Sequence, residues 1–180
     1  MKSRIWIAGV GVCLALGGAW PCSATTYYVN DNSDVNDVYT GGLGFDGNPG
    51  TNSALPKLTV ASVLTNAMAP GDIVYIDTGT YATNVMIGPS VVGTAMNRIL
   101  FQGSTNFAGG GTVFTAAGTR AFRVQGQYIT IRDLRLMNSQ IGLSLDGASF
   151  CEIERVIAYS NSVNSIEMIG ASNSNAIRRS

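Results

Sequence analysis

The 180-residue chain carries eleven lysines and arginines, eleven aspartates and glutamates and no histidine, so its formal net charge is zero. Charge is also sparse, at 12% of the residues, which argues against the strongly basic surfaces that bind nucleic acid or anionic membranes. Without histidine the chain can build neither a Ser-His-Asp triad nor a His-ligated zinc site.

The N-terminal 24 residues have the three-part plan of a secretory signal peptide. Lys2 and Arg4 form a basic start, an uncharged and mostly apolar run covers residues 5–20, and small residues precede a cleavage site after Ala24. The alternative is a membrane anchor, but a run of about 16 residues is shorter than the roughly 20 that a spanning helix needs. We therefore expect an exported protein, either secreted or at the cell surface or in the periplasm, with no membrane span after cleavage.

Residues 25–57 are predicted to form one short strand and a long polar loop. The strand is Thr26–Val29, which is aromatic and β-branched, and the residues after it are rich in Gly, Asn and Asp. Residues 32–36, with Asp31 before them and Asp34 among them, resemble the start of a calcium loop, but its essential Gly and bidentate Glu are missing. The stretch is either a solvated acidic loop or a weak Ca²⁺ site through Asp31 and Asp34. No other cofactor is indicated.

Residues 58–180 are predicted to begin with a capping helix and to continue as coils. Apolar side chains at helical spacing predict a helix over residues 58–68, which Pro70-Gly71 ends. Residues 72–77 then have the composition of a second strand.

From about residue 98 onward two tracks repeat with a period of about 22 residues. The first aligns residues 129–134, 151–156 and 175–179, and the second aligns residues 122–126, 143–147 and 166–170. Such short intervals leave no room for crossover helices, so each period must be one coil of short strands, about 4.8 Å from the next coil. Alternation places one set of apolar side chains inside the coils: Phe122, Val124, Ile129, Ile131, Leu134, Leu136, Leu143, Leu145, Ile153, Val156, Ile166 and Met168.

Four motifs precede the repeats: Tyr27-Tyr28-Val29, the stretch GFDGNPGT from Gly44 to Thr51, Pro70-Gly71-Asp72 and Gly79-Thr80-Tyr81. With the coil pattern, they resemble the N-terminal entry of pectin-lyase-like right-handed β-helix proteins. The resemblance implies an all-β fold, a single-stranded right-handed parallel β-helix (a solenoid) with a short N-terminal capping helix. It does not specify an activity, because the superfamily contains polysaccharide lyases and hydrolases beside non-catalytic binding and adhesive proteins. Since Ser180 lies inside a coil, we expect the natural protein to continue beyond it.

Two columns of outward charged residues are a candidate surface. The repeat stacks Arg132, Glu154 and Arg178 in one column, and Asp133, Arg155 and Arg179 in the next. Neighbours of opposite sign attract across such a short spacing, so the columns can act as a charge ladder that fixes the register of the coils. The functional alternative is an Arg/Glu surface that binds an acidic sugar.

A second outward track carries the candidate catalytic residues Arg123, Asp146 and Glu167. The resemblance implies that a lyase of this superfamily would hold Ca²⁺ with carboxylates and abstract a proton with Arg or Lys. The two carboxylates lie one coil apart at different positions along the strand, and a hydrolase also needs two carboxylates facing a cleft. A merely solubilising role is the alternative, and we expect no complete active site in these residues.

Two functions stay open at this point. The chain belongs either to an exported β-helix protein that binds or degrades polysaccharide, with its active site in further coils, or to a non-catalytic extracellular adhesin, stalk or glycan-binding solenoid. A polysaccharide or cell-surface glycan is the expected partner, and nucleic acid is not. The sequence does not specify the oligomeric state.

Overall fold

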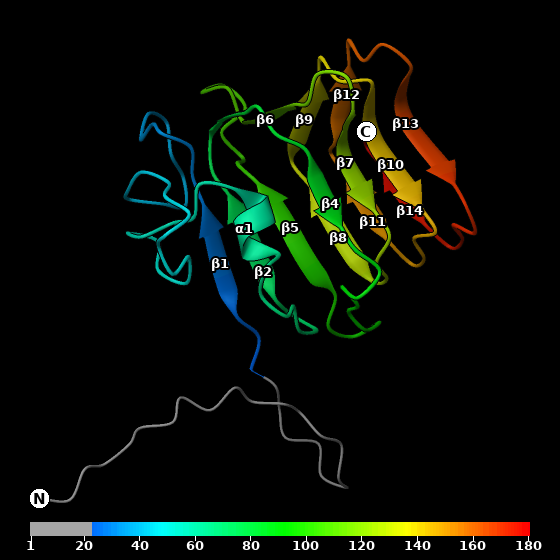
Figure 1. Cartoon of the computed structure of the whole chain (residues 1–180), viewed down its shortest axis with the longest axis horizontal. Coiled ribbons are helices and arrows are strands. Elements are labelled where there is room, and N and C mark those ends of the chain that lie inside the picture. The colour runs from blue at the N-terminus through cyan, green and yellow to red at the C-terminus, as the bar shows by residue number, and fades with distance from the viewer. Residues whose placement is uncertain (1–22) are drawn as a thin grey trace, which may run out of the picture.

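The computed structural model describes residues 23–180, and nearly all of the predicted signal peptide, residues 1–24, lies outside them. The chain winds into stacked coils, from β1 at one end to β13 and β14 at the other (Figure 1). The coils build three parallel sheets, which we call the six-stranded sheet, the β3 sheet and the β4 sheet. The six-stranded sheet contains β1 (Thr26–Val29), β2 (Ile73–Ile76), β5 (Ile99–Gly103), β8 (Ile129–Arg132), β11 (Glu152–Glu154) and β14 (Ala176–Arg178). The β3 sheet contains β3 (Gly79–Tyr81), β6 (Thr112–Thr115), β9 (Leu134–Met137) and β12 (Ile157–Tyr159), and the β4 sheet contains β4 (Val85–Ile87), β7 (Arg120–Val124), β10 (Ile141–Asp146) and β13 (Asn164–Ile169).

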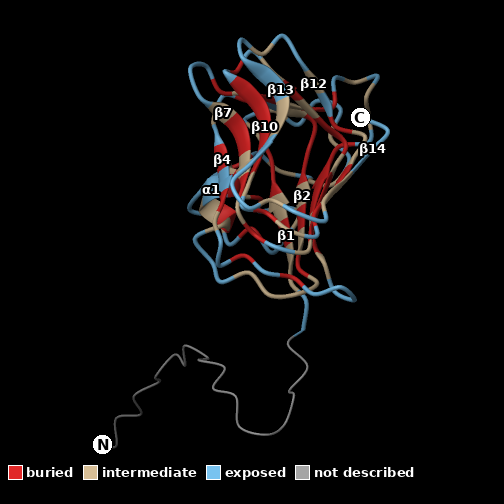
Figure 2. Cartoon of the chain, turned by 90° about the vertical axis from the view of Figure 1, so that its right-hand side faces the viewer, coloured by how far each residue is buried: buried red, intermediate tan, exposed pale blue. Residues whose placement is uncertain are grey.

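The strand register follows the predicted repeat. Ile153 pairs with Ile131 on one side and with Ile177 on the other, and Leu143 pairs with Phe122 and Ile166. The predicted inward residues of the first two tracked coils are fully buried and form one continuous core. Figure 2 shows that the buried stretches of the chain lie mainly along the strands. The predicted all-β, right-handed parallel β-helix fold is therefore confirmed.

The inward prediction is less accurate at β13. Ile166 is half-buried, and Met168, which pairs with Leu145, is 57% exposed. The physical reason is that β13 is an edge strand of the β4 sheet in the described chain, so no further strand covers its side chains.

Sharp corners between the sheets use left-handed backbone at ordinary residues. Asp133, Arg155 and Arg179 occupy equivalent corner positions and have φ values of 59°, 50° and 54°. Asp133 alone separates β8 from β9, so one left-handed residue turns the chain from one sheet to the next. This backbone costs about 1–2 kcal/mol for a residue with a Cβ, so contacts between stacked corners must offset it.

The capping helix is much shorter than predicted. Instead of covering residues 58–68, α1 spans Val60–Val63, and Thr59 caps its N-terminus by accepting a hydrogen bond from an N–H of the first turn. Side chains end the helix early, because Thr65 Oγ1 and Asn66 Nδ2 donate to the backbone carbonyls of Ser62 and Val63. The helix nevertheless lies against the first coil, in contact with β1, β2 and β4. Among residues 23–180, no helix has the length and apolar character to cross a membrane.

The polar loop after β1 is anchored by Asp77, a buried residue that directly follows β2. Its carboxylate accepts hydrogen bonds from the backbone N–H groups of Val38, Tyr39 and Thr40 at 2.7, 2.8 and 2.7 Å. One carboxylate thereby fixes a loop that is distant in sequence against the first coil.

Candidate functional site

The β4 sheet carries the three candidate catalytic residues on its outer face. Arg123 and Asp146 are brought together, and Arg123 Nε donates to Asp146 Oδ2 at 2.9 Å. Glu167 does not join them. It pairs instead with Arg120, whose Nε lies 3.0 Å from Glu167 Oε1, and it accepts a hydrogen bond of 2.7 Å from Ser144 Oγ. Sequence reasoning missed Arg120, because a long arginine side chain can reach a carboxylate two coils away.

These ion pairs occupy both carboxylates. Burial alone would raise the pKa of Glu167, but the hydrogen bonds from Ser144 and Arg120 hold that pKa below its ordinary value. A group of this kind stays ionised and is a poor general acid, which needs a raised pKa. Asp146 is likewise held by Arg123 and lies 3.4 Å from the Gln125 amide. The β4 face is therefore a paired, polar surface.

The N-terminal loop holds the two candidate calcium ligands. Asp31 accepts hydrogen bonds from the Ser33 N–H at 2.8 Å and from the Thr80 N–H at 3.1 Å, which ties the loop to β3. Asp34 is exposed. In the described chain no three acidic, cysteine or histidine side chains gather closely enough to hold a metal ion. Ca²⁺ binding through Asp31 and Asp34 stays a prediction.

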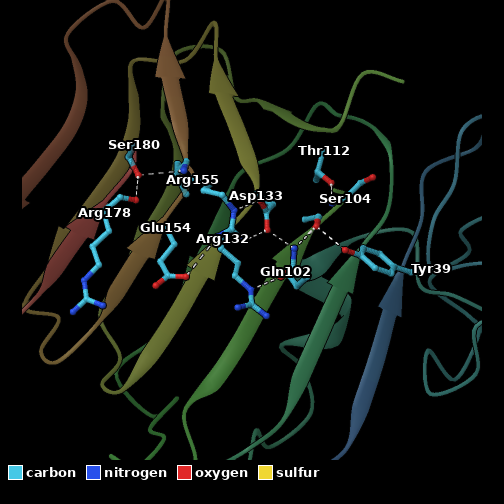
Figure 3. Close-up of polar contacts among 12 residues, drawn as sticks. Tyr39, Gln102, Ser104, Thr112, Arg132, Asp133, Glu154, Arg155, Arg178 and Ser180 are labelled. Carbon is cyan, nitrogen blue, oxygen red and sulfur yellow. Dashed lines mark hydrogen bonds and ion pairs between the residues drawn. The ribbon is translucent and has the colours of Figure 1, made fainter. Parts of the chain in front are cut away.

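The corner between the six-stranded sheet and the β3 sheet contains a buried ion pair (Figure 3). Asp133 is 1% exposed, and Arg155 Nε and Nη2 each donate to one of its carboxylate oxygens at 2.7 Å. Gln102 Nε2 adds a third hydrogen bond of 2.7 Å, and Gln102 also accepts one from Arg132. Burial would raise the pKa of Asp133, but the hydrogen bonds from Arg155 and Gln102 hold it below its ordinary value. The carboxylate is therefore ionised and locks successive corners together.

Beside this corner lies a hollow of about 230 Å³ that is lined by Glu154, Arg155, Arg178 and Arg179. Strand pairing confirms the predicted column, since Glu154 pairs with Arg132 on one side and with Arg178 on the other. Glu154 lies 3.9 Å from Arg155. Arg178 and Arg179 are exposed, and neither forms an ion pair with any residue between 23 and 180. The hollow therefore presents guanidinium groups that no carboxylate of the described chain neutralises.

Comparison with known proteins gives a likeness of structure alone. No protein-family model matches the chain, and no curated protein matches it. A solved rhamnogalacturonan lyase is similar, with 18% sequence identity and a TM-score of 0.47 over 78% of this chain and 43% of that one. The pectate lyase Pel9A is similar at 17% identity and a TM-score of 0.39, over 77% of this chain and 41% of that one.

The chain thus spans less than half the length of either lyase. The assignment of the fold rests on the strand pairing itself. By that pairing the chain has the parallel β-helix fold that its sequence motifs predicted.

Proposed function

We propose that the chain is part of an exported β-helix protein that binds or degrades polysaccharide, and that the coils described here bind an acidic polysaccharide without cleaving it. The observation that carries this proposal is the hollow lined by Arg155, Arg178, Arg179 and Glu154. Guanidinium groups recognise carboxylates through paired hydrogen bonds, and a uronate offers one carboxylate per sugar residue.

The distribution of charge supports an anionic partner at this end of the coils. All arginines of the described chain lie between Arg98 and Arg179, whereas Lys57 is the one basic residue before them. Around the hollow, Arg132, Arg155, Arg178 and Arg179 outnumber the carboxylates of Asp133 and Glu154. A uronate chain can therefore supply the carboxylates that Arg178 and Arg179 lack among the residues between 23 and 180.

Binding is favoured over cleavage by the state of the acidic side chains on the β4 sheet. Asp146 is held by Arg123, and Glu167 is held by Arg120 and Ser144, so neither is placed as a general base or nucleophile. If the whole protein degrades polysaccharide, its active site lies in other coils. If it has no such site, it is a glycan-binding adhesin or stalk, and the same hollow serves it.

Isothermal titration of the full chain with polygalacturonate at low salt tests this proposal. The Arg178→Ala/Arg179→Ala variant is expected to bind roughly tenfold more weakly, as two exposed ion pairs worth up to about 1 kcal/mol each would give. Arg123→Ala, which removes the same side chain from the β4 sheet, is the matched control and should bind as the wild type does. An unchanged affinity in the double variant, or a wild-type protein that binds a neutral polymer equally well, would contradict the proposal.

A further inference from the structure

An aromatic stack stands at the corner that leads into the six-stranded sheet. The rings of Tyr128 and Phe150 are parallel, with an interplanar angle of 5° and a centroid separation of 4.7 Å. That separation is close to the roughly 4.8 Å between neighbouring parallel strands, so the stack follows the coil repeat. Arg98 lies beneath it, with its guanidinium carbon 5.9 Å from the centre of the Tyr128 ring.

The stack of rings does not extend to the third level. Register places Tyr128, Phe150 and Ser174 at equivalent positions, and all three have left-handed backbone, with φ values of 52°, 57° and 52°. At the third level a small, exposed serine replaces the ring. Phe150 consequently remains 41% exposed, although Tyr128 covers one of its faces.

The outward side chains next to Ser174 are small, acidic and basic. Along the outer face of β14 the next outward side chains are Ala176, which is also small, and Arg178. One coil below, Ala176 pairs with Glu152, whose side chain is one-third exposed and lies 3.6 Å from Arg98. The small side chains of Ser174 and Ala176 leave a step in the surface, which we call the small-residue step. An apolar ring face, a carboxylate and the guanidinium of Arg178, which forms no ion pair with residues 23–180, border this step.

A second pair of stacked rings, on the same sheet, is covered by another part of the chain. Tyr28 and Tyr75 stack at 5.9 Å, and the N-terminal loop places Tyr39 over Tyr75 at a centroid distance of 4.5 Å. There the chain covers its own aromatic surface. At Phe150 it does not, within the described residues.

Building on the proposed function, we infer that one pyranose ring of the bound polysaccharide stacks on Phe150 at the level of Ser174. The C–H face of the sugar lies against the aromatic ring. Its hydroxyl groups donate to Glu152, and the carboxylate of a uronate residue reaches Arg178. The ligand is thus a uronate-containing glycan. Phe150 recognises the flat face of its sugar ring, and Arg178 recognises its carboxylate.

Filling the step with a side chain is the sharpest test. Ser174→Phe extends the stack by one ring, and the backbone tolerates it because Tyr128 and Phe150 adopt the same φ at equivalent positions. Ser160→Phe is the matched control, since Ser160 is also exposed and left-handed, with a φ of 53°, at a different corner. Phe150→Ser removes the platform instead of filling the step, and Tyr159→Ser removes a comparably exposed aromatic ring from the β3 sheet.

Each variant of the full chain is titrated with trigalacturonate and with neutral galactotriose. Ser174→Phe and Phe150→Ser should lower the affinity for both sugars by roughly tenfold, the scale of one aromatic contact, while the two controls leave it unchanged. Arg178→Ala should weaken the binding of trigalacturonate alone.

The outcomes separate the two proposals. If Arg178→Ala weakens trigalacturonate binding but Ser174→Phe binds as the wild type does, the stacking site is refuted and the proposed function stands. A wild-type chain that binds neither sugar overturns both.

Discussion

Replacing Arg155 by methionine should leave the Asp133 carboxylate inside its corner without the cation that neutralises it. Asp133 is 1% exposed, and the guanidinium of Arg155 supplies two of its hydrogen bonds. Breaking a buried ion pair by removing one partner costs about 3–5 kcal/mol. Here the Arg155 side chain is 40% exposed and Gln102 keeps its hydrogen bond to Asp133, so we expect a loss of about 2–3 kcal/mol.

Urea denaturation followed by circular dichroism measures this loss. The Arg155→Met/Asp133→Asn double variant should recover most of it, because asparagine is neutral and tolerates left-handed backbone. The pKa of Asp133 is lowered in the folded protein, so the ion pair stabilises the fold above the unfolded pKa of about 3.9, and this stabilisation disappears as the pH falls through the folded pKa. If Arg155→Met unfolds within about 0.5 kcal/mol of the wild type at pH 7, a difference typical of plain surface positions, the stabilisation of the buried Asp133 carboxylate by Arg155 is refuted.

Three further predictions concern the loop, the cap and activity. Burial, with the nearby charge of Asp77, raises the pKa of Asp37 to about 6, so the folded state binds this proton more tightly and stability should rise as the pH falls from 7 toward 4. Asp37→Asn should remove that rise and stabilise the protein at pH 7 by at most about 3 kcal/mol. The urea midpoints of both proteins are measured at pH 7 and pH 5, and an equal change of the midpoint in the two proteins would contradict the raised pKa of Asp37. Val63→Asp should lower the free energy of unfolding by several kcal/mol, measured by thermal melting, because Val63 is fully buried in α1. Leu64→Asp should lower it less because Leu64 is only partly buried, and an equal loss in both variants would contradict a helix that ends at Val63. Residues 25–180 should release no unsaturated product or reducing sugar from pectate, alginate or chondroitin, with or without Ca²⁺; turnover above a heat-treated control that is lost in Asp146→Ala would restore the catalytic interpretation of the β4 sheet.

The coil register could be predicted from the sequence because it depends on local repetition. Alignment at about 22 residues placed Ile131 beside Ile153 and Arg132 beside Glu154, and the strand pairing agrees with both. The helix length was not predictable in the same way. Thr65 and Asn66 occupy polar positions between the apolar residues of the helical pattern, but their side chains bind backbone carbonyls that would otherwise continue the helix.

Contacts that cross coils or join distant segments were harder to predict. Arg120 binds Glu167 two coils away, and Asp77 binds the loop near Tyr39, although neither pair shares a position in the repeat. The Asp133–Arg155 pair was foreseen as a column of charges. Its burial was not, because the burial depends on Gln102 and on the tightness of the one-residue corner.

A titration of the ¹⁵N-labelled chain with trigalacturonate, followed by backbone amide chemical shifts, tests most directly where an acidic glycan binds. The account predicts the largest changes at Glu154, Arg178 and Arg179, with Phe150 and Ser174 beside them. Changes centred on Arg123 and Asp146 of the β4 sheet, or no changes at all, would contradict it.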